Sequence, residues 1–235
     1  MNTPETPIPA LPSSTTLIGK LGVVALISGL LVALVYEYTK PIIAENQRAA
    51  LEGALFKVLP ASAESRLTYR LQDDRLVRVP DNTPNNGDLI YAGYDKNRKL
   101  VGIALTAAAQ GYQDTVRILY AYDPYNSCIT GFAVLKSTET PGFGDKIDKD
   151  PAFLENFQCL DAKVNDEPSA LAHGIRTVRH GTKKNPWEID AISGSTITSN
   201  AVGRMLDKSG QFFHPVIAKN LNLLENAQPA TQPKR

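Results

Sequence analysis

One stretch near the N-terminus is almost without polar side chains, and it limits what this chain can fold into. The run Leu21–Tyr38 is nearly all apolar and has no charge before Glu37. A helix needs about 20 apolar residues to cross a bilayer, with about 17 at the lower limit. Because Leu17 and Ile18 extend the run, residues 17–38 are predicted to form a transmembrane helix in contact with membrane lipid.

A cleaved secretion signal is the alternative interpretation of this run. Such a signal has a shorter apolar region that ends in small residues at a cleavage site. Here the preceding residues 1–16 are rich in Pro, Thr and Ser, and no Ala-x-Ala site follows the run. We therefore expect an uncleaved anchor preceded by a disordered arm over residues 1–16. The flanking charges do not decide the direction of the span.

The rest of the chain alternates helix-like and strand-like segments. Apolar residues at helical spacing predict a helix over Ile42–Leu59, which would begin near Pro41 and extend the anchor as a stalk. Three pairs of runs rich in β-branched and aromatic residues follow, each pair joined by turn formers. These hairpins are expected at residues 67–79, 89–105 and 116–135.

The C-terminal half is expected to hold helices around these hairpins. Short helices are predicted at Pro151–Asn156 and Pro168–Arg176, and a longer one from Ser199, with Ser199 or Asn200 as its N-cap. The fold class is therefore α+β, with mostly antiparallel hairpins and flanking helices. The folded domain would cover residues 39–221, and residues 222–235 would form a flexible tail.

Composition excludes some functions and leaves one question open. The formal net charge of +1 gives no electrostatic reason for nucleic-acid binding. The three histidines are scattered and no CxxC occurs, so no metal site is predicted. Cys128 and Cys159 would be able to pair in an oxidising compartment, but two free thiols fit the sequence equally well.

The richest motif gathers five hydroxyl side chains around one glycine, just before the last helix-like segment. A Gly/Ser turn at a helix N-terminus presents unpaired N–H groups and the positive end of the helix dipole, both of which favour phosphate. An ordinary capping turn is the alternative, because Ser and Thr also cap helices for local reasons. The candidate binding residues are Asp190, Ser193, Gly194, Ser195, Thr196, Thr198 and Ser199.

A second motif, Glu-Thr-Pro-Gly-Phe-Gly, lies about fifty residues upstream. Its Pro-Gly pair suits a type II turn, with glycine at the position that needs a positive φ. A surface turn would explain Pro and Gly but not the Glu and Thr before them. The candidate residues here are Glu139, Thr140, Gly142 and Gly144, and the pair Gly111-Tyr112 between two hairpins is added to them.

The two motifs resemble those of membrane-bound FMN-binding proteins. The Asp-x-x-Ser-Gly-x-Thr spacing is similar to the flavinylation motif, which implies that Thr196 carries FMN covalently through a phosphoester bond. The second motif is similar to the ETPGLG loop that packs near the flavin ring, with Gly111-Tyr112 opposite it. Two residues depart from the pattern, because Ser195 stands where alanine is usual and Phe143 where leucine is usual.

Taken over most of its length, the chain resembles the G subunit of the bacterial Rnf/Rsx electron-transport complex. The C subunit of the sodium-pumping NADH:quinone oxidoreductase, which shares the FMN domain, is the nearest alternative. The resemblance implies a single-pass inner-membrane protein with a periplasmic FMN domain, so that the arm over residues 1–16 would be cytoplasmic. Its partners would be the other subunits of an ion-translocating complex, and a separate flavin transferase would attach the FMN. It would be an electron-transfer subunit rather than a stand-alone catalyst.

Two other functions stay open at this point. A cofactor-free assembly subunit would keep the same loops without a flavin. A membrane-anchored regulator with the same domain would be expected to carry a further domain or further spans, which the sequence does not contain.

Overall fold

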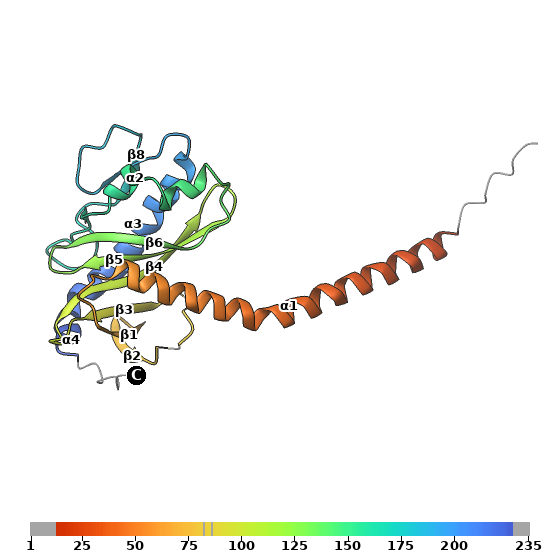
Figure 1. Cartoon of the computed structure of the whole chain (residues 1–235), viewed down its shortest axis with the longest axis horizontal. Helices are drawn as coiled ribbons and strands as arrows, with labels where there is room; N and C mark the ends of the chain where they lie inside the picture. The colour runs from red at the N-terminus through yellow and green to blue at the C-terminus, as the bar shows by residue number, and fades with distance from the viewer. Residues whose placement is uncertain (1–12, 82, 86, 228–235) are drawn as a thin grey trace, which may run out of the picture. The chain divides into compact units, whose positions relative to one another are not determined.

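The computed structural model describes residues 13–81, 83–85 and 87–227 (Figure 1). The chain divides into two compact units, Met1–Ala49 and Ala50–Arg235. Residues 1–12 of the expected arm and residues 228–235 of the expected tail lie outside the described residues. The α+β fold expected from the sequence is confirmed.

The anchor is part of a single long helix, α1 (Ser14–Val58). Of the helices among the described residues, α1 alone is long and apolar enough to cross a membrane, and the large apolar side chains in its first half are exposed. The helix starts at Ser14, so the arm expected over 1–16 is too long by three residues. Pro41 lies inside α1 instead of starting a new helix. A proline removes one helical N–H bond, and nearby the Thr39 hydroxyl donates to the Val35 carbonyl oxygen at 2.8 Å.

The domain is built on a seven-stranded antiparallel sheet in the order β2-β1-β3-β4-β5-β6-β7. All three predicted hairpins are present in it. Their strands are β1 (Ser65–Gln72) with β2 (Arg75–Val79), β3 (Leu89–Tyr94) with β4 (Leu100–Gln110), and β5 (Thr115–Asp123) with β6 (Cys128–Lys136). The edge strand β7 (Leu160–Asp161) is short.

Helices cover the two faces of this sheet. The end of α1 packs through Leu55 against Tyr91 and Leu119 on one face, whereas α3 (Thr196–Lys219) lies on the other (Figure 1). Every residue of β3 is therefore buried, although a sheet with one wet face would show alternation. Arg66 of β1 also forms a two-pronged ion pair with Glu52 of α1, at 2.5 Å.

The segment between β6 and α3 contains the smaller elements. These are the 3-10 helix η1 (Gly144–Asp148), α2 (Pro151–Glu155), and the parallel strands β8 (Arg176–Val178) and β9 (Glu188–Asp190). The short helix expected at 151–156 is confirmed by α2. A disulfide joins Cys128 to Cys159, which resolves the open question of these two thiols.

Residues 168–176 and the C-terminal segment differ from the sequence predictions. Residues 168–176 form no helix, because side chains of α3 bind their backbone: Leu171 N–H donates to Gln211 and Ile175 N–H to Asp207. The expected tail also begins too early, since α4 (Leu221–Glu225) buries Leu224, whose carbonyl accepts the Tyr94 hydroxyl. Tertiary contacts decide both cases.

Candidate functional site

The hydroxyl-rich motif forms a tight turn between β9 and α3. Ser195 N–H donates to the Ile192 carbonyl oxygen at 3.1 Å, and Gly194 adopts a φ of 79° inside this turn. Residues with a Cβ rarely adopt such a conformation, so the glycine is required by the backbone. α3 then begins at Thr196, three residues before the predicted start, with Ser195 in the N-cap position.

Ser199 does not cap the helix as the sequence suggested. Its hydroxyl accepts the Ile192 N–H at 3.1 Å and donates to the Ser195 carbonyl oxygen at 2.9 Å. This buried hydroxyl therefore ties the two ends of the turn together. The consequence is that Thr196 sits at the first helical position, on a turn whose shape is set from inside the helix.

The N-terminus of α3 has the features of an anion site. The first N–H groups of a helix have no partner within it, and no side chain caps them here. Ser195 Oγ is buried and has no hydrogen-bond partner among the described residues. Thr196 and Ser193 are exposed beside it. A phosphate bound here would accept hydrogen bonds from the backbone N–H groups and from the Ser195 hydroxyl, and the positive end of the helix dipole would stabilise its charge.

Glu139 joins three segments of the candidate site. Its carboxylate accepts the Thr198 hydroxyl at 2.5 Å, the Tyr112 N–H at 3.2 Å and the Gln113 N–H at 3.0 Å. The side chain is 7% exposed. The structure thus brings one residue of each motif, Thr198 and Glu139, together with the Gly111-Tyr112 pair. Because both oxygens are occupied, Glu139 holds the site together instead of offering a free acceptor.

The electrostatics of Glu139 agree with this role. Burial alone would raise the pKa of its carboxyl group. The hydrogen bond from Thr198, followed by those from the Gln113 and Tyr112 N–H groups, outweighs burial and lowers the pKa below its ordinary value. The carboxylate is therefore charged at neutral pH and its bonds are charge-assisted.

Two of the predicted glycines are explained by close approach to this carboxylate. A Cβ added to Gly111 or to Gly144 would lie 3.0 Å from the Glu139 carboxyl carbon. In the loop that contains Glu139 and Gly144, Phe143 N–H donates to the Thr140 carbonyl oxygen. Gly142 has a φ of 80°, as the predicted type II turn requires.

Three exposed apolar side chains belong to the segments that meet at Glu139. Tyr112, Phe143 and Ile197 are 68%, 61% and 50% exposed. Tyr112 donates its backbone N–H to Glu139, and Phe143 lies in the same loop as Glu139. Ile197 directly precedes Thr198, whose hydroxyl donates to Glu139. Thr140 is exposed in the same loop, with its hydroxyl 3.4 Å from the Gln113 amide oxygen. A flat aromatic ring with a polar edge matches these side chains, as a phosphate matches the nearby helix N-terminus.

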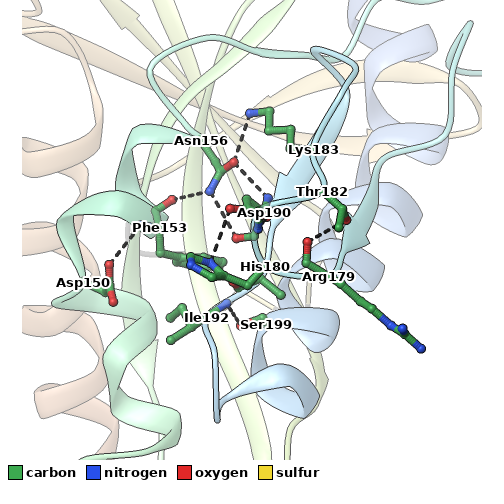
Figure 2. Close-up of polar contacts among 12 residues, drawn as sticks. Asp150, Phe153, Asn156, Arg179, His180, Thr182, Lys183, Asp190, Ile192 and Ser199 are labelled. Carbon is green, nitrogen blue, oxygen red and sulfur yellow. Dashed lines mark hydrogen bonds and ion pairs between the residues drawn. The ribbon is translucent and has the colours of Figure 1, made fainter.

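Asp190, the first residue of the motif, serves the loop before β9. Its carboxylate accepts the Gly181 N–H at 2.7 Å and lies 3.4 Å from His180 Nδ1 (Figure 2). The same His180 nitrogen lies 3.0 Å from the Ala191 carbonyl oxygen. The backbone of Asp190 is bound by Asn156, a residue that the sequence analysis missed because it lies in no motif.

Comparison with known proteins agrees with this geometry. The FMN-binding domain family matches residues 111–209, and the RnfG N-terminal region family matches residues 19–58. The chain is thus similar to RnfG proteins along α1 and to FMN-binding domains over its folded domain. The first match covers Gly111, both motifs and the start of α3, and the second covers most of α1.

Named relatives extend this comparison. The G subunit of the ion-translocating oxidoreductase complex of Methanosarcina acetivorans is 29% identical over 188 residues, covering 80% of this chain and 88% of the relative. The G subunit of the proton-translocating ferredoxin:NAD(+) oxidoreductase complex of Clostridium ljungdahlii is 29% identical over 182 residues, covering 77% and 82%. These relatives favour an RnfG protein over the alternative, the corresponding FMN subunit of the quinone reductase.

A solved structure supports the fold. NqrC of Shewanella oneidensis aligns with a TM-score of 0.52 at 21% identity, covering 71% of this chain and 86% of that chain. At this identity the likeness concerns the fold alone.

Proposed function

We propose that this chain carries FMN in a phosphoester bond to Thr196 Oγ1 and relays electrons within an ion-translocating oxidoreductase complex. The observation that carries the proposal is the geometry at Thr196. This exposed hydroxyl stands on an uncapped helix N-terminus, beside the buried and unpartnered Ser195 Oγ. When bound, FMN would supply the redox chemistry, and the protein would position it and set its environment.

The residues divide into a phosphate end and a ring end. The α3 N–H groups, Ser193, Gly194 and Ser195 would surround the phosphate. Tyr112 and Thr140, with the exposed apolar side chains around Glu139, would lie against the flavin ring. Glu139, Thr198 and Ser199 would act by holding these segments in place, since their polar atoms are already bonded within the protein.

The bond to Thr196 would be made by a separate flavin transferase that uses FAD. The Thr196 oxygen forms a bond to the phosphorus of the FMN half, and the pyrophosphate bond of FAD breaks. AMP leaves, and the hydroxyl proton passes to a base of the transferase. The product gains the mass of one FMN less one water.

Three features support a periplasmic domain on a single inner-membrane span. The helix α1 is long and apolar enough to cross the bilayer once. A disulfide joins Cys128 and Cys159, and such bonds persist in the periplasm and are rare in the cytosol. A covalent tether is also most useful where little free FMN is present. The partners would be the other subunits of the complex, with the membrane lipid around α1.

The attachment test is the intact mass of the full chain produced together with a flavin transferase. The wild-type chain should carry one FMN less water, and Thr196→Val, which keeps the shape but removes the oxygen, should carry none. Ser195→Ala is the matched control and should keep the adduct. A flavin adduct on Thr196→Val would refute the site, and a flavin-free wild-type chain would favour the cofactor-free assembly subunit.

The topology test labels single introduced cysteines with a membrane-impermeant reagent in cells with a permeabilised outer membrane. Lys96→Cys, in the exposed turn between β3 and β4, should be labelled, and Ser14→Cys at the start of α1 should not. The opposite labelling pattern would place the domain in the cytoplasm.

A further inference from the structure

The side chain of Asn156 binds the backbone at the start of the acceptor turn, the segment 190–196 that leads from β9 to Thr196. It follows α2, is 6% exposed, and faces β9 (Figure 2). Its amide oxygen accepts the Asp190 N–H at 2.9 Å, and its amide nitrogen lies 3.4 Å from the Asp190 carbonyl oxygen. One amide thus meets both polar backbone groups of a single residue.

Strand pairing explains why Asp190 needs such a partner. β9 pairs only with β8 among the described residues, and the Ala191 N–H donates to the Val178 carbonyl oxygen at 3.0 Å. In a parallel ladder the polar groups of alternate residues point to opposite edges. The groups of Asp190 therefore face the edge without a strand. Asn156 occupies that edge and pairs with them as a neighbouring strand would.

The Asn156 amide is itself held in one orientation. Its nitrogen donates to the Phe153 carbonyl oxygen at 2.9 Å, and its oxygen also accepts Lys183 Nζ at 3.0 Å. A donor on the oxygen and acceptors on the nitrogen exclude the flipped amide. The Cys128–Cys159 disulfide anchors the segment three residues further on to β6. The Asn156 amide therefore has one orientation, and the segment that carries it is held to the sheet by the disulfide.

We propose that Asn156 is a positioning residue for the covalent loading of FMN, which it serves by fixing the β9 end of the turn that presents Thr196. The inference rests on the proposed attachment of FMN to Thr196. Asp190 is the last residue of β9 and Thr196 the first of α3. Within the acceptor turn, Asn156 binds the backbone of Asp190 and Ser199 binds the N–H of Ile192. Transfer of a phosphoryl group needs the attacking oxygen in line with the bond that breaks, and small displacements slow such steps strongly.

The experiment measures flavin transfer to the flavin-free full chain in detergent, with a purified flavin transferase and FAD. Asn156→Ala should lower kcat by roughly tenfold to a hundredfold while leaving KM for the chain nearly unchanged, because the surface that the transferase meets is intact. The matched control is Asn165→Ala. Asn165 also binds the backbone of its own loop, accepting the Ser169 N–H at 3.0 Å, but it lies outside the acceptor turn, so its kcat should equal wild type.

A second variant separates positioning from general stability. Asn156→Asp keeps the acceptor for the Asp190 N–H but turns the donor toward the Phe153 carbonyl into a second acceptor. Protonation of the new carboxyl group restores a donor, so kcat relative to wild type should rise as the pH is lowered. A purely structural role would not produce this pH-dependent recovery in protein that stays folded.

Hydrogen exchange of residues 188–195 provides a readout that is independent of flavin. Asn156→Ala should increase exchange there and leave the central strands β3 to β5 unchanged. Unchanged exchange, a kcat within threefold of wild type in folded Asn156→Ala, or a flat pH ratio in Asn156→Asp would each overturn the inference. If the wild-type chain is not labelled on Thr196, the proposed function fails and the inference fails with it. A labelled wild type with an equally active Asn156→Ala defeats the inference alone.

Discussion

Replacing Glu139 by Gln removes the charge that connects three segments of the site while nearly keeping the size of the side chain. One carboxylate oxygen accepts the Thr198 hydroxyl and the Tyr112 N–H, and the other accepts the Gln113 N–H. A Gln has only one acceptor oxygen, so its amide nitrogen must face a backbone N–H in either orientation. In the Glu139→Gln variant, the amide nitrogen therefore faces another donor at one of these contacts, and the remaining hydrogen bonds lose their charge.

The size of the effect follows from the three bonds. A hydrogen bond to a charged group contributes about 1.5–3 kcal/mol and a neutral one about 0.5–1.5 kcal/mol. Losing one charge-assisted bond and weakening two others sums to about 3–5 kcal/mol, and partial hydration at the rim reduces this to about 3 kcal/mol. For a domain of this size that corresponds to a fall in Tm of roughly 6–12 °C.

The assay is thermal unfolding of the full chain in detergent, followed by the fluorescence of Trp187, the single tryptophan. The pKa of Glu139 is lowered in the fold, so its contribution is present at neutral pH and is lost as the pH falls through the folded pKa. Glu139→Gln should therefore differ from wild type at pH 7 and approach it in acid. Asp145→Asn, in the same loop, is the control and should shift Tm less. A Tm for Glu139→Gln within 2 °C of wild type at pH 7 would contradict the role assigned to the carboxylate.

Three further predictions concern other parts of the domain. Burial lowers the pKa of His214 to about 4, so the unfolded chain binds a proton first, and stability should fall by about 3 kcal/mol between pH 7 and pH 4; His214→Gln should flatten that part of the curve in pH-dependent melts. Replacing Cys128 and Cys159 by Ala opens a loop of 31 residues and should lower the free energy of unfolding by about 3–4 kcal/mol. Reduction of the wild-type protein should reproduce this loss, and an unchanged Tm would count against it. Thr140→Ala should change the flavin spectrum or redox potential of the loaded protein but leave the covalent mass intact, whereas an unaltered spectrum and potential would make this loop a structural turn only.

Features that depend on neighbouring residues were predictable from the sequence. The span in α1 follows from an uninterrupted apolar run, and the three hairpins from alternating strand and turn residues. The turn at Gly142 followed from its Pro-Gly pair. The sequence also placed Thr196 in a turn just before a helix, although α3 begins at Thr196 itself.

Features that depend on distant partners were not predictable. Glu139 meets Thr198 across 59 positions and Asn156 meets Asp190 across 34, and neither pairing leaves a periodic trace in the sequence. The same reason explains the errors at residues 168–176 and at the C-terminus, where α3 and Tyr94 supply the partners. Local propensity determined the elements and the chemistry of the acceptor turn. Only tertiary packing decided where α3 begins and which side chains hold the site together. The physical reason is that each buried polar group must bond to a partner that the fold, and not the neighbouring sequence, brings next to it.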